Sequence, residues 1–340
     1  MGIGGRAASR KKEARYLSML MEFRQVTRAF AARRGLFDPR SARVLAVNDV
    51  SLSLAAGETL GLVGESGCGK STLARMAVRL LPPTSGDILL EGRALEQWSV
   101  AELARRAQMV FQDPFSSLDP RHRVGASVAE PLLLAERAQG RSPTRNELRE
   151  AVRAMLERVG LPAEHADRYP HEFSGGQRQR VAVARALIAG PRLVVCDEPV
   201  SALDASVQAQ ALNLLKDLQA ERGLTYLFIS HDLGVVGFMS DRVAVMYLGR
   251  VVELAAREEL FEGAAHPYTE ALLAAAPVRD PQARRERPAL SGELPSPLDP
   301  PVGCAFHPRC PYARDICSRE EPPLAERSAG HLARCHFPLN

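Results

Sequence analysis

A glycine-rich turn between an apolar run and a helical stretch constrains the fold of this chain more than any other feature. The turn is Gly64-Glu65-Ser66-Gly67-Cys68-Gly69-Lys70-Ser71-Thr72; it follows the apolar run Thr59–Val63 and opens a helix expected over Lys70–Leu81. A strand, a G-x-x-x-x-G-K-[ST] turn and a helix in this order are typical of loops that bind nucleotide phosphates. Glycines let backbone N–H groups converge on phosphate oxygens, and the helix N-terminus adds its positive end. We therefore expect Lys70 to contact the β- and γ-phosphates and the Ser71 hydroxyl to bind Mg²⁺.

A second apolar run ends in two acidic residues, as a magnesium–nucleotide site requires. Leu193–Cys196 has the composition of a buried strand, and Asp197 and Glu198 follow it directly. We expect Asp197 to hold Mg²⁺ directly or through water. We expect Glu198 to orient or deprotonate the attacking water. An acidic strand end is weak evidence by itself, and it gains force from the glycine-rich turn upstream.

Apolar runs alternate with helical stretches over most of the chain, which is typical of a parallel α/β sheet covered on both faces. From Pro114 to Gly190 the strand pattern stops, and Glu147–Val159 has the apolar spacing of an amphipathic helix. Near the start, Phe23–Thr27 and Val44–Leu54 resemble strands of an antiparallel layer. The expected fold is a mostly parallel α/β sheet with an antiparallel β layer and a helical insertion. Its other expected elements are the strands Gln108–Phe111, Leu224–Ile229 and Arg242–Tyr247 and the helix Ser206–Arg222.

The two ends of the chain differ from this body. Half of the 24 prolines lie between Pro277 and Pro338, a frequency that excludes a long helix or a central strand. We therefore expect residues 263–340 to form a loop-built C-terminal extension. Residues 21–262 are then the nucleotide-binding domain, with a helical subdomain at about 114–190. Residues 1–20 are expected to be a basic, disordered extension, or to precede a start at Met19 or Met21.

Four of the six cysteines crowd the C-terminal extension with the spacing Cys304-x5-Cys310-x6-Cys317-x17-Cys335. In a reducing compartment such clustering argues for a metal more than for disulfide bridges. A metal can replace the missing hydrophobic core by tying the loops together. Tetrahedral Zn²⁺ and a [4Fe–4S] cluster both fit four thiolates, although the spacing lacks the short C-x2-C pairs of zinc ribbons. Unligated or disulfide-paired cysteines stay an alternative, as does a mixed zinc site using His307, His331 or His336.

The remaining motifs carry a resemblance to a known family. Ser174-Gly175-Gly176-Gln177, 23 residues before Asp197, places a hydroxyl and glycine N–H groups at a helix start, ready to hold a phosphate. This stretch resembles the signature of the ATP-binding cassette (ABC) family, whose fold is of the P-loop NTPase type. The other family motifs are Gln112, the D-loop Ser201-Ala202-Leu203-Asp204, the switch residue His231, and Phe30 as the aromatic that stacks on adenine.

The resemblance implies an ATPase that uses ATP and Mg²⁺. It places Glu198 and His231 in catalysis, and Ser71, Gln112 and Asp197 around Mg²⁺. It also implies a head-to-tail dimer with a second ABC ATPase subunit, identical or different. In that dimer Ser174–Gln177 completes the ATP site of the partner subunit, and catalysis is mainly positioning and electrostatics.

Three further segments resemble the oligopeptide/dipeptide importer group. They are the stretch Gln112–Arg121, the triplet His266-Pro267-Tyr268 with the cysteine tail, and Gly35-Leu36-Phe37, which is most like the second, "F"-type ATPase. The group implies two transmembrane permease subunits, an extracytoplasmic peptide-binding protein as an indirect partner, and a [4Fe–4S] cluster in the tail. The chain is then expected on the cytoplasmic face of the cell membrane, as a peripheral subunit that powers peptide import.

Two other functions are alternatives to peptide import. A sibling system that imports nickel or another small solute has the same ATPase motifs. A soluble ABC ATPase acting on nucleic acid would carry a stronger basic excess than the net charge of +4 found here, so no nucleic-acid partner is expected. No apolar run approaches the roughly 18 residues needed to cross a bilayer.

Overall fold

The computed structural model describes residues 19–33, 41–113, 118–275 and 292–339. Three segments singled out in the sequence fall outside these ranges: residues 1–18, Gly35-Leu36-Phe37, and residues 114–117 after Gln112. Met19 and Leu20 are described and belong to the first strand, β1. The strand therefore includes two residues that the sequence assigned to the N-terminal extension.

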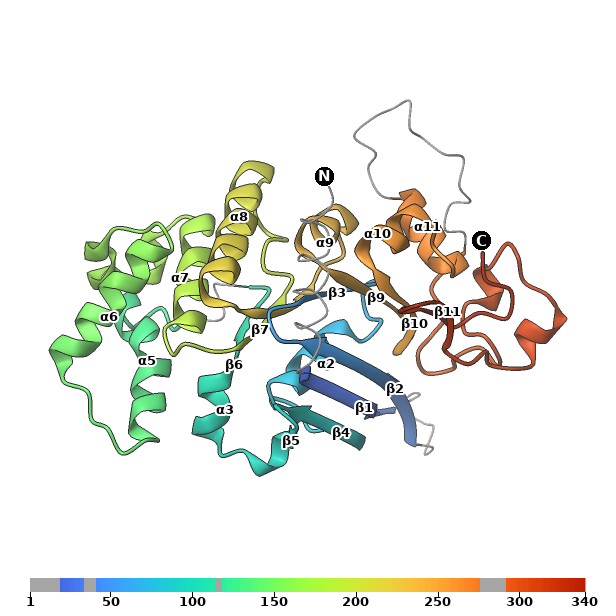
Figure 1. Ribbon diagram of the computed structural model, residues 1–340, viewed down its shortest axis with the longest axis horizontal. Helices are drawn as coiled ribbons and strands as arrows, with labels where there is room; N and C mark the ends of the chain where they lie inside the picture. Colours follow the sequence, from blue (N-terminus) through green and yellow to red (C-terminus); the bar gives the residue numbers. More distant parts are fainter. Residues whose placement is uncertain (1–18, 34–40, 114–117, 276–291, 340) are drawn as a thin grey trace, which may run out of the picture.

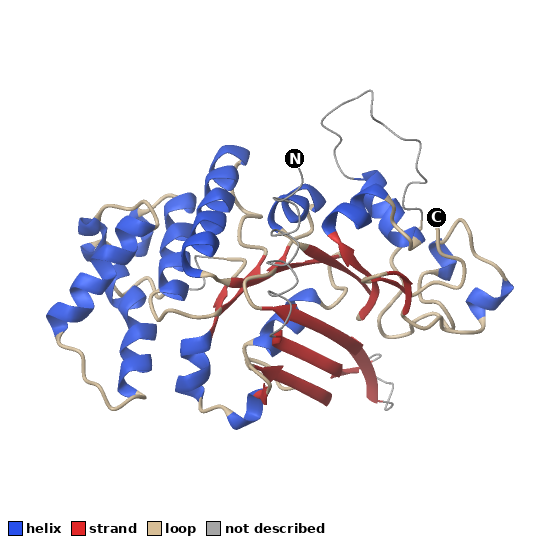
Figure 2. Cartoon of the chain, viewed as in Figure 1, coloured by secondary structure: helices blue, strands red, loops and turns tan. Residues whose placement is uncertain are grey.

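Two sheets lie at the centre of the molecule (Figures 1 and 2). Among the described residues, the larger sheet has eight strands in the order β11-β12-β10-β9-β3-β8-β7-β6, and the strands from β9 to β6 run parallel. The smaller sheet is antiparallel, in the order β2-β1-β4-β5. The predicted mostly parallel α/β sheet with an antiparallel layer is thus confirmed. The strands are β1 Met19–Arg33, β2 Ser41–Ala55, β3 Thr59–Val63, β4 Ser85–Leu90, β5 Arg93–Ala94, β6 Ala107–Val110, β7 Leu193–Asp197, β8 Thr225–Ile229, β9 Arg242–Tyr247, β10 Arg250–Ala256, β11 Ala325–Ser328 and β12 His331–Ala333.

Side chains of the parallel strands alternate between two apolar cores, one on each face of the large sheet. In β8, Tyr226 and Phe228 point into one core while Leu227 and Ile229 point into the other. The first core also holds α7, α8 and α9, and the second holds α2 and the small sheet. Because both faces are buried, the strands are continuously apolar, as the sequence pattern indicated. The helices are α2 Lys70–Ala77, α3 Val100–Arg106, α5 Val124–Arg137, α6 Arg145–Arg158, α7 Gly175–Leu187, α8 Ala205–Arg222, α9 Leu233–Met239, α10 Arg257–Glu262 and α11 Pro267–Ala275.

The described part of residues 114–190 contains α5, α6, two short 3-10 helices and α7, and no strand. Thr144 caps α6 by accepting a hydrogen bond from the Glu147 N–H, and the Glu147 carboxylate returns one to the Thr144 N–H. Val152, Met155 and Leu156 then face the core, which confirms the predicted amphipathic helix. Figure 1 shows these helices (green) at the opposite end of the large sheet from the C-terminal segment (red).

The helix that follows the glycine-rich turn is shorter than predicted. It ends at Ala77, four residues before the expected Leu81. Arg79 adopts a left-handed conformation with φ 57° and donates through its guanidinium to the carbonyls of Leu95 and Trp98. These two hydrogen bonds hold Arg79 in this left-handed conformation, in which the chain leaves the helix.

The C-terminal segment joins the large sheet, which the sequence did not predict. β12 pairs antiparallel with β10, and β11 pairs with β12. The buried Glu253 of β10 accepts hydrogen bonds from the N–H groups of Ala265 and His266, and its carboxylate lies 2.7 Å from His331 Nε2 of β12. This bond raises the pKa of His331. The rest of residues 292–339 is loop with the 3-10 helices η5 (His307–Arg309) and η6 (Asp315–Ser318), as expected from the prolines. No helix among the described residues is long and apolar enough to cross a bilayer.

Candidate active site

The glycine-rich turn leaves β3 and closes tightly on its neighbours. Gly64 has φ 150° and Gly69 has φ 108°, conformations that L side chains rarely adopt. A Cβ at Gly64 would lie 2.2 Å from the Met246 carbonyl oxygen, and one at Gly69 would lie 2.0 Å from that of Ala46. Only glycine fits at either position. The turn therefore keeps its N–H groups in a bare backbone cradle at the start of α2, which fits a phosphate group.

The first residues of α2 carry the polar groups of this cradle. Lys70 is buried, and its Nζ donates to the carbonyl oxygens of Gly64 at 2.7 Å and Glu65 at 2.9 Å. The Ser71 hydroxyl donates to Asp197 Oδ1 at 2.9 Å. Burial raises the pKa of Asp197, and the hydrogen bond from Ser71 opposes that rise. A hydroxyl and a carboxylate held together are hard oxygen donors of the kind that Mg²⁺ takes.

Two predicted residues converge on one carboxylate oxygen of a third, Glu198. Gln112 Nε2 donates to Glu198 Oε2 at 3.1 Å, and His231 Nδ1 lies 3.1 Å from the same oxygen. The Glu198 side chain is 16% exposed, whereas that of His231 is 61% exposed. Glu198 also has φ 48°, an uncommon conformation for a residue with a side chain. The carboxylate is thus fixed in direction at the edge of the site.

The sheet topology explains why residues so far apart in the sequence meet. β3, β8, β7 and β6 are parallel neighbours, so their carboxyl ends share one edge. One predicted motif lies at or just after each of these ends: the glycine-rich turn, His231, Asp197 with Glu198, and Gln112. Ligands of open α/β sheets bind at this edge.

The signature stretch forms the N-terminus of α7. Ser174 is exposed and caps the helix by accepting from the Gln177 N–H at 3.3 Å, while Gln177 Oε1 accepts from the Ser174 N–H. A Cβ on Gly176 would lie 2.4 Å from Val207, so this glycine permits close packing of α7 on α8. Gly175 lies near Leu203 of the D-loop. The signature and the D-loop therefore form one surface.

The D-loop, Ser201-Ala202-Leu203-Asp204, runs from the catalytic edge to α8. The Ser201 hydroxyl donates to the Glu198 carbonyl oxygen at 3.1 Å, and Asp204 caps α8 by accepting from the N–H groups of Ser206 and Val207. Ser201, Ala202 and Asp204 are exposed. The loop thus connects Glu198 with the signature surface.

The adenine contact of Phe30 and the part that Cys68 and its neighbours take in phosphate binding stay predictions. Phe30 lies in β1 under the Arg28 guanidinium, 4.8 Å from the ring centre, so its contact with adenine stays a prediction. Cys68 is buried, and burial raises the pKa of its thiol. Its side chain faces inward, while Ser66 and Gly67 of the same turn are exposed and Thr72 is half-buried.

The structure adds two residues that sequence reasoning did not connect with the turn. The Tyr268 hydroxyl accepts from the Glu65 N–H at 2.9 Å, and Arg309 Nη1 donates to Glu65 Oε2 at 2.7 Å. Both come from the C-terminal part of the chain, more than 200 positions away. No local pattern connects residues so distant.

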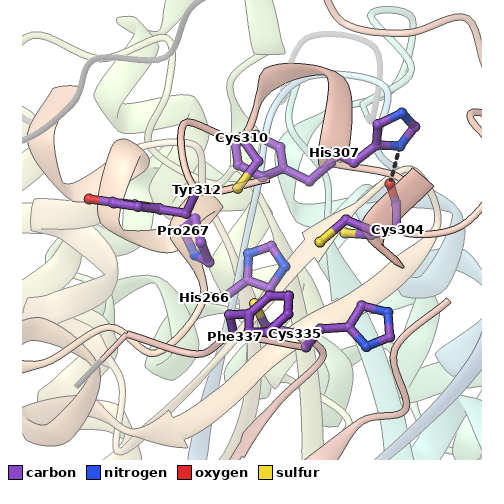
Figure 3. A pocket seen from close by; sticks show the side chains of 11 residues that line it. His266, Pro267, Cys304, His307, Cys310, Tyr312, Cys335 and Phe337 are labelled. Atoms are coloured by element: carbon purple, nitrogen blue, oxygen red, sulfur yellow. Dashed lines mark hydrogen bonds between the residues drawn. The ribbon is translucent and has the colours of Figure 1, made fainter. Parts of the chain in front are cut away.

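The four tail cysteines gather at one place. Together with aromatic and imidazole rings they line a single pocket, in which Figure 3 labels Cys304, Cys310 and Cys335 around His266 and Phe337. All four are free thiols. Burial is the main cause that raises the pKa of Cys304 to about 11, and the other three thiols raise it further. Among the described residues, no group of three or more His, Cys, Asp or Glu side chains is arranged to hold a metal ion.

The turn, the Ser71–Asp197 pair and the Glu198 cluster define a P-loop protein built to hold and hydrolyse a nucleoside triphosphate. The comparisons identify its family. Residues 47–201 match the ABC transporter model, and residues 252–317 match the model of the oligopeptide/dipeptide transporter C-terminal region.

Curated relatives match almost the whole chain. It is 50% identical to the oligopeptide transport ATP-binding protein AppF of Bacillus subtilis, over 94% of this chain and 97% of that one. It is also 50% identical to the dipeptide transport ATP-binding protein DppF of Haemophilus influenzae, over 90% and 93% of the two chains. The ATP-binding cassette MJ0796, solved as a dimer bound to ADP and Pi, is 28% identical with a TM-score of 0.61, covering 70% of this chain and 98% of that one. The chain belongs to the ABC transporter family of ATP-binding proteins, in its oligopeptide/dipeptide group, and is an ATPase that uses ATP and Mg²⁺.

Proposed function

We propose that this protein hydrolyses ATP to power the import of dipeptides or oligopeptides through an ABC transporter. The observation that carries the hydrolytic role is the convergence of Gln112 and His231 on Glu198 Oε2, beside the phosphate loop. The printed names of the relatives and the matched C-terminal region support peptides as the cargo.

The residues of the site divide the work of hydrolysis. The backbone of the loop and Lys70 bind the phosphates. Ser71 and Asp197 would hold Mg²⁺, which would supply positive charge to offset the charge developing on the transferred phosphate. Glu198 takes the proton of the attacking water. Gln112 and His231 orient the Glu198 carboxylate by hydrogen bonds. Gln112 is also a proposed ligand of Mg²⁺.

A second ABC ATPase subunit, identical or different, completes each site in a head-to-tail dimer. The exposed Ser174 supports this arrangement, because it places a hydroxyl at the surface at the N-terminus of α7. The D-loop connects the same surface to Glu198. Closure of the dimer would then bring Ser174–Gln177 onto the ATP of the partner subunit.

Two transmembrane permease subunits are the proposed membrane partners, with an extracytoplasmic peptide-binding protein acting through them. A groove of about 310 Å³ between the turn after α2, β6, α3, α5 and α7 supports a docking place. Its wall includes Leu80, 55% exposed, and Val100, 73% exposed, and it contains Phe111 next to Gln112. A permease helix in this groove would place the protein on the cytoplasmic face of the cell membrane and connect it with the catalytic edge.

Peptide uptake by cells tests the proposal. In cells that express the cognate permease but lack its ATPase subunit, the wild-type chain should restore uptake of a labelled dipeptide. Val100→Arg places a charge in the groove and should lower uptake at least about 10-fold, because it blocks docking without touching the ATP site. Val302→Arg is the matched control, since Val302 is also 73% exposed but lies in the C-terminal segment.

Three outcomes would contradict the proposal. Restored uptake of nickel without peptide would favour the sibling importer. A chain that binds nucleic acid and restores no uptake would favour a soluble ABC ATPase that acts on nucleic acid. Equal uptake with both valine variants would remove the groove as the docking place.

The chain organisation is proposed as a short N-terminal extension, a nucleotide-binding domain to residue 262 and a C-terminal extension over 263–340. The end of α10 at Glu262 and the start of α11 at Pro267 support the second boundary. The structure describes β1 from Met19 onward, so the first boundary is proposed at residue 19 and not at residue 21.

A [4Fe–4S] cluster is the group we propose for the four tail cysteines. Four thiols lining one pocket support it, because such a cluster is held by four cysteine thiolates. The three alternative histidines are engaged elsewhere: His307 with the Cys304 carbonyl, His331 with Glu253, and His336 with the Glu320 carbonyl. The proposed role is structural.

Anaerobic purification with iron and zinc analysis and a visible spectrum tests this assignment. We expect a brown protein with about four iron atoms per chain. Cys335→Ser should lose most of the iron, whereas Cys196→Ala in β7 should keep it, because Cys196 lies in the core of the sheet. A colourless protein with stoichiometric zinc, or with four free thiols and no metal, would contradict the cluster.

A further inference from the structure

The phosphate loop is tied to the cysteine-bearing segment by a two-pronged ion pair. Arg309 Nη1 donates to Glu65 Oε2 at 2.7 Å, and Nη2 donates to Oε1 at 3.1 Å. The side chain of Arg309 is only 5% exposed, and that of Glu65 is 27% exposed. A two-pronged, poorly solvated pair is stronger and more directional than a surface ion pair. The pair therefore fixes the position of the Glu65 carboxylate.

A second contact from the same part of the chain fixes the Glu65 backbone. The Glu65 N–H donates to the hydroxyl of Tyr268, which is fully buried at the start of α11. The Tyr268 ring packs on Tyr247 and Phe306, with centroids 4.7 and 5.4 Å away. Its own N–H donates to Nδ1 of the buried His266, whose pKa burial lowers to about 4, so this ring is neutral at neutral pH. Tyr268 is thus a rigid acceptor.

Glu65 also accepts a hydrogen bond from the phosphate-binding Lys70. Lys70 Nζ donates to the Glu65 carbonyl, so a shift of Glu65 moves an acceptor of Lys70. The carboxylate of Glu65 is, in addition, a negative charge in a loop that receives phosphates. Arg309 offsets that charge, and removing it would leave an uncompensated carboxylate beside the anionic ligand.

We propose that Arg309 and Tyr268 are positioning residues for ATP. Both belong to the C-terminal extension, and both hold the phosphate loop through Glu65. Arg309 directly precedes Cys310, so the cysteine-bearing segment must be folded around its pocket for the loop to bind ATP fully. The inference rests on the proposed function in that ATP is the ligand. It gives the C-terminal segment a second role at the ATP site.

A double-mutant cycle on the full-length chain tests the inference by the dissociation constant and KM for MgATP. Arg309→Ala should raise both about 10-fold and change kcat less, because the loss lies in binding. When Glu65 is already glutamine, adding Arg309→Ala should change the dissociation constant less than about threefold, since the charge it offset is gone. Arg309→Lys keeps the positive charge but cannot make the two parallel hydrogen bonds of the guanidinium. Its dissociation constant for MgATP should lie between those of wild type and Arg309→Ala.

Two controls separate this effect from a disrupted segment. Arg319→Ala removes an exposed arginine of the same segment and should leave ATP affinity unchanged. Metal content should be the same in Arg309→Ala as in wild type. The thermal midpoint should fall, because a buried ion pair is lost, but unfolding should stay a single cooperative transition.

The possible failures are distinct. If the wild type does not bind ATP, the proposed function itself fails. If the wild type binds and Arg309→Ala binds equally well, only the inference is overturned. It is also overturned if Arg309→Ala weakens binding as much in the Glu65→Gln background as alone, because its effect then does not pass through Glu65.

Discussion

Replacing Glu198 with glutamine should lower ATP turnover by about 10²–10⁴-fold while ATP still binds. Glutamine has the same shape, so the uncommon backbone conformation at φ 48° is kept. It loses the oxygen that can take a proton from water. ATP affinity and steady-state hydrolysis, measured on the same preparation, separate binding from chemistry.

Two further variants sharpen this result. His231→Ala removes one of the two groups that orient Glu198 Oε2 and leaves the bond from Gln112, so its loss of turnover should be smaller than that of Glu198→Gln. Glu157→Gln changes an exposed carboxylate of α6 and should leave turnover unchanged. Full activity in Glu198→Gln would remove Glu198 as the base.

Most of the catalytic edge could be predicted from the sequence because its parts are local. Each motif follows an apolar strand directly, and parallel strands bring their carboxyl ends to one edge. The predicted strands at this edge agree with β3, β6, β7 and β8 to within one residue at each end. Asp197 and Ser71, assigned separately to Mg²⁺, lie hydrogen-bonded to each other. The motifs and the parallel topology together were sufficient to predict which residues meet at this edge.

What the sequence did not predict depends on contacts between distant segments. Glu65 and Arg309 are separated by 244 positions, and no periodicity relates them. The three residues of β12 are too few for a strand pattern, and they pair because β10 offers an edge and Glu253 binds His331. The early end of α2 is set by Arg79, whose guanidinium is bound by carbonyls from η1 (Leu95–Gln97) and beyond. In each case tertiary contacts decide the local structure.

Replacing Lys70 with alanine should weaken ATP binding and turnover together, in contrast to Glu198→Gln. A hydrogen bond from a charged group to phosphate is worth enough that its loss should raise the dissociation constant for ATP about 10–100-fold. Turnover should fall as well, because the same ammonium offsets charge on the transferred phosphate. ATP binding by calorimetry and hydrolysis at saturating ATP measure the two effects separately.

Lys216→Ala is the matched control for this lysine. Its ammonium lies 5.1 Å from the centre of the Phe238 ring, on α8 and away from the phosphate loop. Both measurements should therefore match wild type. Lys70 is buried with Nζ on two carbonyls, so its variant also needs a thermal midpoint to show that the loop has kept its fold. A folded Lys70→Ala protein with wild-type ATP affinity would show that the backbone N–H groups hold the phosphates alone, and that Lys70 acts only on the chemical step.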